Sequence, residues 1–277
     1  MSRSPDAASS MNIFVCIKEI QNPELSSEVF RVDEERKQVV PVPGMSLVSN
    51  PFDEQAMEAA LRLRDAGIEV NITAVTLGPK SAQAALKRAL SMGADSGILV
   101  SEDGLDTLDA VGVATALCRA MERSGPVDLV LAGRQGADWD AGIVGCAIAE
   151  ILRIPMISFA KSLRIDSSNV IVERVLDQGF ETVQAPLPCV VTIANELGEP
   201  RKASLRETMR AAKKPTVVYD GATLGVTSDF VRQSAARRAR QRLFIPAKEG
   251  TCEMFTNGSA QDIAGRVAAR LREAKCL

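Results

Sequence analysis

The chain contains no histidine among its 277 residues. Catalytic triads that depend on histidine and metal sites with histidine ligands are therefore excluded, and we predict no metal site. General acid–base chemistry would have to use carboxylates, lysine or a bound cofactor. We therefore assign no catalytic residue and look for places where a cofactor could bind.

Six cysteines are present, and none of them forms a C-x-x-C pair. Most lie in apolar segments, which favours buried, reduced thiols in a reducing compartment. They are Cys16, Cys118, Cys146, Cys189, Cys252 and Cys276.

Neither the dinucleotide fingerprint G-x-G-x-x-G nor a phosphate loop occurs in the sequence. Three loops that follow predicted strands are weaker candidates for a nucleotide site. Two of them open predicted helices, whose N-terminal N–H groups suit phosphate. Glycines at strand ends are also common in plain turns, so these residues alone leave both interpretations open. The candidates are Cys16-Ile17-Lys18, 76–79 and 133–140.

Composition limits the classes of partner. The net charge is −2 and aromatic residues make up 4% of the chain, so neither electrostatics nor base stacking favours nucleic acid. The first ten residues lack the apolar core of a signal peptide, and no apolar run approaches the roughly 20 residues of a membrane helix. We predict a soluble, cytoplasmic protein without membrane insertion.

Short apolar segments alternate with amphipathic helical patterns from Met11 onward. This alternation predicts an α/β fold with a Rossmann-like open, mostly parallel sheet and helices on both faces. The strand-end loops then lie along one edge, where ligands usually bind. Predicted strands are 11–18, 70–77, 98–100 and 127–132; predicted helices run from Asn50-Pro51 to Gly67, from Ser81 to Gly93, 108–121 and 141–152, and 28–43 is an inserted hairpin.

The pattern changes after Ile154, where four strands follow without long helices between them. Residues 216–256 are weakly patterned, and a final amphipathic helix spans about 259–275. We expect a disordered N-terminal extension, 1–10, an α/β nucleotide-binding domain, 11–215, and a C-terminal arm, 216–277, that packs on another chain. A solvated tail is the alternative.

Two segments carry a resemblance to a known family. Residues 172–192 read VERVLDQGFETVQAPLPCVVT, and residues 198–215 read GEPRKASLRETMRAAKKP. Together they resemble the signature of electron transfer flavoprotein beta subunits, although Gln178 stands where the family prefers glycine or an acid. The resemblance covers nearly the whole chain after Met11. It implies an adenine-nucleotide-hydrolase-like fold and an electron carrier subunit that forms a heterodimer with an alpha subunit.

The resemblance also implies a nucleotide site. Carboxylates at 138 and 140 would accept hydrogen bonds from ribose or adenine, and backbone N–H groups after Ala141 would hold phosphate. Carried over by position, the cofactor-binding residues are Cys16, Asn50, Val75, Leu77, Gly78, Gly133, Asp138, Asp140, Ala141, Gly142, Ile143 and Val144.

The identity of the nucleotide depends on where this chain departs from the family. Ile143 replaces a glutamine of the family pattern, which removes a side-chain amide, and Trp139 replaces a small residue. One branch of the family holds structural AMP here. The electron-bifurcating branch holds a second FAD that NADH reduces, and the tail 271–277 is similar to that branch. We predict FAD, with AMP as the alternative.

The segment after Pro200-Arg201 implies a docking surface. The resemblance implies that Leu205 is the apolar anchor for a partner such as an acyl-CoA-dehydrogenase-like flavoprotein. Its cationic surroundings are Arg206, Arg210, Lys213 and Lys214. Without the resemblance, an amphipathic helix with a solvated basic face explains the same residues.

Arg174 and Glu181 flank a turn and are expected to pair across strands.

Two other classes of function are the alternatives. A universal-stress-like nucleotide-binding regulator shares the α/β plan, but it would explain neither 198–215 nor the long C-terminal arm. A hydrolase of adenylated substrates would need a catalytic constellation that the sequence lacks.

Overall fold

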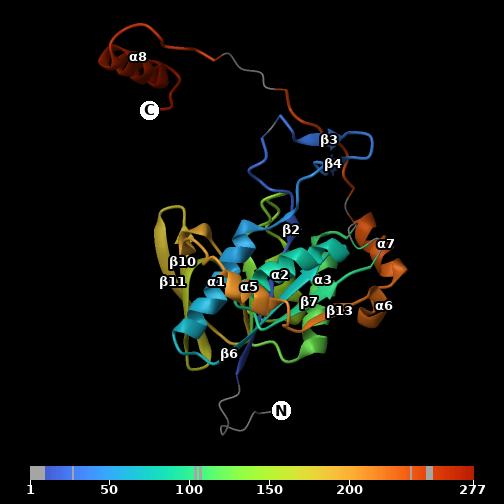
Figure 1. Cartoon of the computed structure of the whole chain (residues 1–277). Coiled ribbons are helices and arrows are strands. Elements are labelled where there is room, and N and C mark those ends of the chain that lie inside the picture. The colour runs from blue at the N-terminus through green and yellow to red at the C-terminus, as the bar shows by residue number, and fades with distance from the viewer. Residues whose placement is uncertain (1–9, 27, 103–104, 106–107, 238, 248–251) are drawn as a thin grey trace. The chain divides into compact units, whose positions relative to one another are not determined.

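A computed structural model describes residues 10–26, 28–102, 105, 108–237, 239–247 and 252–277 (Figure 1). Its main feature is a nine-stranded sheet of order β11-β10-β9-β12-β8-β1-β6-β7-β13. In this order, all neighbouring strands between β9 and the β13 edge are parallel. At the other edge, β10 pairs antiparallel with both β9 and β11. The predicted α/β fold is confirmed. The strands are β1 (Met11–Cys16), β6 (Val70–Leu77), β7 (Ser96–Val100), β8 (Leu129–Gly133), β9 (Met156–Asp166), β10 (Asn169–Leu176), β11 (Gly179–Pro186), β12 (Cys189–Ile193) and β13 (Thr216–Tyr219).

Helices cover both faces of this sheet (Figure 1). Helices α1 (Pro51–Asp65) and α2 (Gln83–Met92) share one buried cluster with Ile13 and Val15, whereas α3 (Ala110–Ser124) and α4 (Val144–Leu152) share another with Phe14 and Cys16. Successive residues of a strand point to opposite faces, so β1 contributes to both clusters. This explains why the strand is nearly continuous in apolar residues.

Two predicted helix starts, those of α4 and α2, differ from the structure, and the start of α1 is as predicted but lacks a side-chain cap. Helix α4 begins at Val144 rather than Ala141, because Asp140 and Gly142 have positive φ angles of 49° and 61°. Helix α2 follows the short turn η1 (Lys80–Ala82), and the Ser81 hydroxyl donates to Glu19 instead of capping a helix. Asn50 does occupy the N-cap position of α1, but its side chain does not cap it.

Two small sheets and the short turn η3 complete the elements before position 200. Strands β3 (Arg31–Asp33) and β4 (Gln38–Val40) form the hairpin predicted for 28–43. Strand β2 (Glu19–Ile20) pairs with β5 (Val48–Ser49), and η3 (Asn195–Leu197) follows β12.

The expectation of weak structure in 216–256 is wrong for its first part. Strand β13 pairs with β7 and forms one edge of the main sheet, so the sheet continues beyond position 215. Helices α6 (Gly221–Leu224) and α7 (Ser228–Ala236) follow, and both pack near α3. The run Thr216-Val217-Val218-Tyr219 after a proline is a short β-branched strand signal.

The chain divides into two compact units, 1–31 with 39–241, and 32–38 with 242–277. The second contains helix α8 (Ala260–Glu273), which begins at a Ser259–Asp262 capping box and matches the helix predicted for about 259–275. None of its residues is buried. Residues 1–9 of the expected N-terminal extension lie outside the described residues. No helix of the described chain is long and apolar enough to cross a membrane.

The cysteines are free thiols, and they fall into two groups. Cys16, Cys118 and Cys189 are buried, as predicted, and burial raises the pKa of the Cys118 thiol to about 12 and that of Cys189 to about 11. These thiols are neutral and unreactive at neutral pH. The other three are exposed, so the prediction holds for half of them.

Candidate functional site

A single buried carboxylate joins the ends of strands β1 and β8. Asp53, in the first turn of α1, accepts hydrogen bonds from the backbone N–H of Lys18 at 2.8 Å and of Gly133 at 3.2 Å. Asp53 is only 6% exposed. Burial raises the pKa of Asp53 to about 7, although these hydrogen bonds and one from Asn50 oppose the rise. Asp53 thus fixes the two strand ends beside each other.

Asn50 holds the loop that follows β8. Its side-chain Nδ2 donates to the carbonyl of Gln135 at 2.9 Å, and its Oδ1 accepts from the N–H of Ala137 at 3.2 Å. The residue is 1% exposed. Asn50 therefore shapes the 133–140 loop from below rather than presenting its amide to solvent.

Gly133 is required where α1 approaches β8. A Cβ at this position would lie 2.5 Å from Oδ1 of Asp53 and 2.7 Å from the backbone carbon of Phe52. Contacts this short do not occur for real side chains, so any larger residue would push α1 away.

The two carboxylates predicted to contact the nucleotide are held in the same loop. Asp138 pairs with the ammonium of Lys18 at 2.6 Å, and Asp140 accepts from the side-chain amide of Gln135 at 2.7 Å. One oxygen of each carboxylate is engaged in this way. The loop thus has a fixed shape with acidic groups at its tip.

The N-terminus of α4 follows this loop without a side-chain cap. Ile143 occupies the N-cap position and offers no oxygen to the first-turn N–H groups, and no side-chain cap bond is present in the described structure. Ile143 is 42% exposed. Free N–H groups and the positive end of the helix dipole suit an anion such as phosphate.

Two sequence-predicted residues lie too deep for their side chains to touch a ligand. Cys16 and Val75 are buried in the core beneath the site, and burial raises the pKa of the Cys16 thiol. The N–H of Gly78 and the carbonyl of Val75 are used in bonds to neighbouring strands. Leu77 packs against the same core. The structure therefore places Asn50 and Gly133 against the 133–140 loop, buries Cys16 and Val75 in the core, and leaves Leu77 and Gly78 half-buried at the end of β6.

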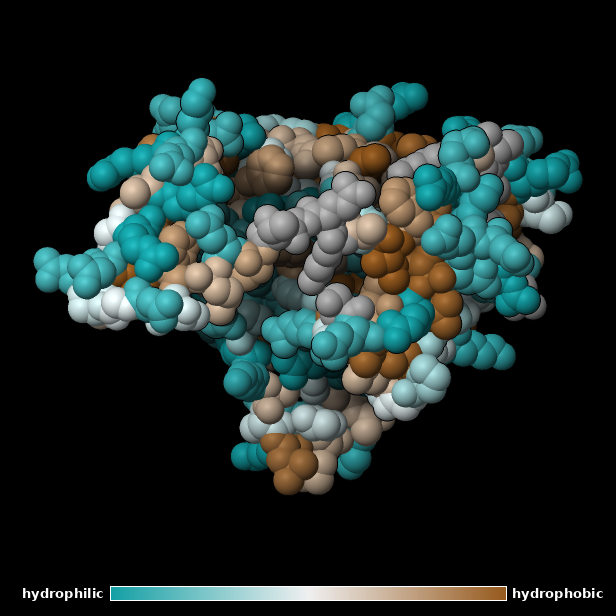
Figure 2. Space-filling model, turned by 90° about the horizontal axis from the view of Figure 1, so that it is seen from above, coloured by the Kyte–Doolittle hydropathy of each residue, from teal (hydrophilic) through white to brown (hydrophobic). Residues whose placement is uncertain are grey.

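Two exposed apolar side chains, Trp139 and Ile143, lie in the 133–144 segment itself. Figure 2 views the molecule from above and shows hydrophobic surface in separate patches among hydrophilic side chains. Trp139 is 46% exposed, and the guanidinium of Arg240 lies 4.4 Å from its ring centroid. Arg134 stacks on Phe52 at 5.3 Å.

A pocket of about 290 Å³ opens between α4 and the strands β9, β10, β11 and β12. Arg174 donates to Ser158 at 3.0 Å beside it and pairs with Glu181 at 3.1 Å, as predicted from the sequence. The lining residues are Arg134, Gly142, Cys146, Met156, Ile157, Ser158, Phe159, Arg174, Val183 and Thr192. In the part of the chain that the structure describes, no group of three or more acidic or cysteine side chains could hold a metal ion.

The predicted docking residues lie on a short, exposed helix, α5 (Leu205–Ala211). Leu205 is 77% exposed, and Met209, one turn further along, is 62% exposed. Of the predicted cations, Arg206, Arg210 and Lys213 are exposed around them, whereas Lys214 is half-buried and donates to carbonyls at the end of α2. Met209 was not predicted as a docking residue, although its i, i+4 spacing from Leu205 places the two side chains on one face of the helix.

Comparison with known proteins agrees with this fold. Residues 46–224 match the family described as electron transfer flavoprotein domain. The caffeyl-CoA reductase–Etf complex subunit CarD of Acetobacterium woodii is 30% identical over 263 residues, which cover 95% of this chain and 98% of that protein.

Two electron transfer flavoprotein beta subunits are similar as well. That of Megasphaera elsdenii is 30% identical and the match covers 94% of this chain and 98% of the relative. That of Bradyrhizobium diazoefficiens is 37% identical, with 68% of this chain and 74% of the relative covered. The chain belongs to the electron transfer flavoprotein family, as one of its electron-carrying beta subunits.

Proposed function

We propose that this chain pairs with an alpha subunit in a heterodimer that relays electrons between a dehydrogenase and other redox partners, and that its 133–144 loop binds FAD that NADH reduces. The observation that carries the proposal is the uncapped N-terminus of α4 beside a loop fixed by Asn50 and Asp53. This arrangement lies at the carboxyl edge of a parallel sheet, where nucleotides bind in open α/β folds.

The residues present fit an adenine nucleotide. N–H groups of the first turn of α4 suit phosphate oxygens, and Asp138 and Asp140 supply acceptors at the tip of the same loop. When bound, FAD supplies hydride acceptance and onward electron transfer, and the protein supplies binding and orientation. Gly133 and Asp53 keep the loop close to β1.

Exposed apolar surface at the loop favours FAD over AMP. Ile143 and Trp139 replace a glutamine and a small residue of the family pattern, and both are more than two-fifths exposed. AMP needs only phosphate, ribose and adenine contacts, whereas FAD carries a further ring system that apolar side chains can cover. The similarity of the tail 271–277 to the bifurcating branch points the same way. AMP in this subunit is the alternative.

The dehydrogenase is proposed to dock on α5. Leu205 and Met209 would fill an apolar groove of the partner, and the surrounding cations would meet an acidic rim. The A. woodii relative is named as a subunit of a caffeyl-CoA reductase complex. A flavoprotein of the acyl-CoA-dehydrogenase kind is therefore the partner class that we propose here.

Substitution of Leu205 tests the docking surface. We expect Leu205→Ala to raise KM for the heterodimer at least about tenfold in its reduction by an acyl-CoA dehydrogenase, because a buried anchor residue is worth about 2 kcal/mol or more. Met209→Ala should act in the same direction. Val29→Ala removes an exposed apolar side chain far from α5 in the sequence and serves as control. Unchanged kinetics for Leu205→Ala would refute docking at α5.

A further inference from the structure

Helix α5 cannot hold its own position. It has seven residues, too few for a stable isolated helix, and Leu205 to Arg210 are all exposed, so that only Ala211 is buried. A Ser204–Glu207 capping box organises its first turn but ties it to nothing else. The orientation of Leu205 and Met209 must therefore be set by contacts outside the helix.

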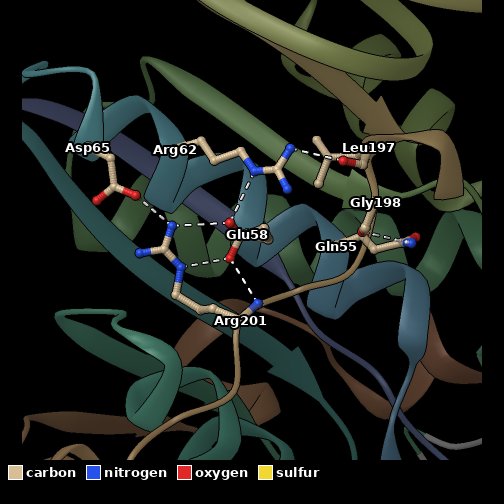
Figure 3. Close-up of polar contacts among 7 residues, drawn as sticks. All are labelled: Gln55, Glu58, Arg62, Asp65, Leu197, Gly198 and Arg201. Atoms are coloured by element: carbon tan, nitrogen blue, oxygen red, sulfur yellow. Dashed lines mark hydrogen bonds and ion pairs between the residues drawn. The ribbon is translucent and has the colours of Figure 1, made fainter.

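The first contact lies before the helix, at Arg201 (Figure 3). Glu58 of α1 accepts hydrogen bonds from the Arg201 backbone N–H at 3.1 Å, from its Nε at 2.7 Å and from its Nη2 at 3.1 Å. Asp65, two turns further along α1, accepts from the same Nη2 at 2.6 Å. A guanidinium held by two carboxylates in this way is fixed in both position and plane.

The carboxylate that receives these bonds is itself immobile. The side chain of Glu58 is 6% exposed and also accepts from Arg62 Nε at 3.0 Å. Burial would raise the pKa of Glu58, but the hydrogen bonds from Arg201 and Arg62 outweigh it and hold the pKa below its usual value. Glu58 is therefore ionised at neutral pH. Arg62 in turn donates to the carbonyl of Leu197 at 2.9 Å, so the approach to Arg201 is fixed as well (Figure 3).

The second contact lies after the helix, at Lys214. Its ammonium donates to the carbonyls of Leu90 at 2.9 Å and Ala94 at 2.5 Å. These carbonyls lie at the C-terminal end of α2, which is the negative end of the helix dipole. Two cations therefore flank α5, Arg201 bound to α1 and Lys214 bound to the end of α2, and α5 also packs against α2 through the buried Ala211.

We propose that Glu58 and Lys214 are positioning residues for electron transfer, which hold α5 in the orientation that a dehydrogenase recognises. The inference rests on the docking role proposed for Leu205. Glu58 is too buried to touch a partner, so it acts through Arg201. A buried ion pair adds little net stability compared with apolar packing, and its use lies in fixing one geometry. A docking element that is already ordered pays less entropy on binding.

The test uses the heterodimer with Glu58→Gln, which keeps the size of the side chain and removes its charge. Because Asp65 is then the only charged partner of Arg201, and glutamine offers it one acceptor oxygen instead of two, we expect faster amide hydrogen exchange in 199–214. We also expect a KM about tenfold higher with an acyl-CoA dehydrogenase that reduces the wild-type heterodimer. The kcat, the bound nucleotide and exchange in β1 and β8 should not change. A merely structural role would instead lower overall stability and leave the split between KM and kcat untouched.

The matched control is Glu54→Gln, one turn earlier on α1. Glu54 instead accepts two hydrogen bonds from Arg88 of α2, at 2.9 and 3.0 Å, whereas the carboxylates that hold Arg201 are Glu58 and Asp65. This variant should leave exchange in 199–214 and KM unchanged. If Glu54→Gln changes KM as much as Glu58→Gln, the positioning role is wrong.

The outcomes separate this inference from the docking proposal. If Leu205→Ala has no effect on KM, docking at α5 fails. If Leu205→Ala raises KM but Glu58→Gln does not, docking stands and the positioning inference is overturned. In the Leu205→Ala/Glu58→Gln double variant, the two increases in KM should not add, because the orientation of α5 no longer affects docking once the Leu205 side chain is absent. Lys214→Met, at the other end of α5, must also raise KM, and it provides the test should Glu58→Gln not fold.

Discussion

Asp53 is the residue on which the geometry of the nucleotide loop depends. Its carboxylate receives the N–H groups of Lys18 and Gly133, and therefore connects strands that are far apart in sequence. Asn50, one turn earlier, fixes the same loop at Gln135 and Ala137. Two polar side chains at the start of one helix thus shape the candidate site from beneath.

A pH dependence follows from the raised pKa of Asp53. The pKa rises from its ordinary value of 3.8 to about 7 on folding, so the folded state holds the proton more tightly. The protonated Asp53 therefore contributes to the free energy of unfolding; this contribution is complete below pH 3.8 and is lost as pH rises through about 7. Wild type should therefore lose at least about 1 kcal/mol of unfolding free energy relative to Asp53→Asn between pH 4 and 8. Denaturant unfolding at several pH values measures the difference, and a constant difference would contradict the raised pKa.

Gly133→Ala should destabilise the protein and weaken nucleotide retention. The added Cβ meets Asp53 and the backbone of Phe52 at contact distances that force α1 away from β8. Overpacking of this kind costs about 1–3 kcal/mol. Thermal unfolding and nucleotide release on dilution measure the two effects. Gly265→Ala, in a helix position with nothing within 4 Å of the new Cβ, is the control and should be neutral or stabilising. Equal behaviour of the two variants would argue against the close approach.

At the residue scale, the sequence indicated which positions belong to the candidate site more readily than what each side chain does there. Asn50 was identified, yet its amide holds a loop rather than capping α1, which depends on a chain segment far away in sequence. Asp53 was missed because an acidic residue in the first turn of a helix is ordinary. Only the tertiary fold, which brings β8 over α1, distinguishes it from Glu54.

Element boundaries near the site depended on backbone conformations that residue types do not reveal. Asp140 is not glycine and still has a positive φ, so the start of α4 moved from Ala141 to Val144. In contrast, β6 matches its predicted range, because a short segment rich in β-branched residues between polar turns is a strong strand signal. Strand β13 was missed since four residues give little periodicity.

Helix α8 is the element expected to contact the alpha subunit. Its residues Ile263, Val267 and Leu271 share one face, and none is buried in the described chain. Val267→Asp should weaken the heterodimer by about 1–3 kcal/mol, because a charge would enter an apolar contact. Ala269→Asp places the same charge on the opposite face and should have little effect. Sedimentation or calorimetry with the alpha subunit measures both, and equal losses would argue against contact through this face.

At the scale of the whole molecule, we propose that one subunit combines two surfaces with different tasks. The carboxyl edge of the sheet carries the loop proposed to bind the nucleotide, and α5 carries the residues proposed for docking. Helix α1 contributes to both, through Asn50 and Asp53 at its first turn and Glu58 and Asp65 further along. The overall α/β plan was predictable from strand and helix periodicity, and the family from 172–192 and 198–215. The buried bonds of α1 were not, because their partners lie between 35 and 143 residues away in the sequence.

The nucleotide content of the purified heterodimer tests the central claim most directly. The chain is co-expressed with its alpha subunit, denatured, and the released FAD and AMP are counted per heterodimer. The account predicts two FAD and no AMP, with NADH bleaching the flavin absorbance under anaerobic conditions. One FAD with one AMP would contradict FAD binding at 133–144, and no nucleotide in this subunit would contradict the site itself.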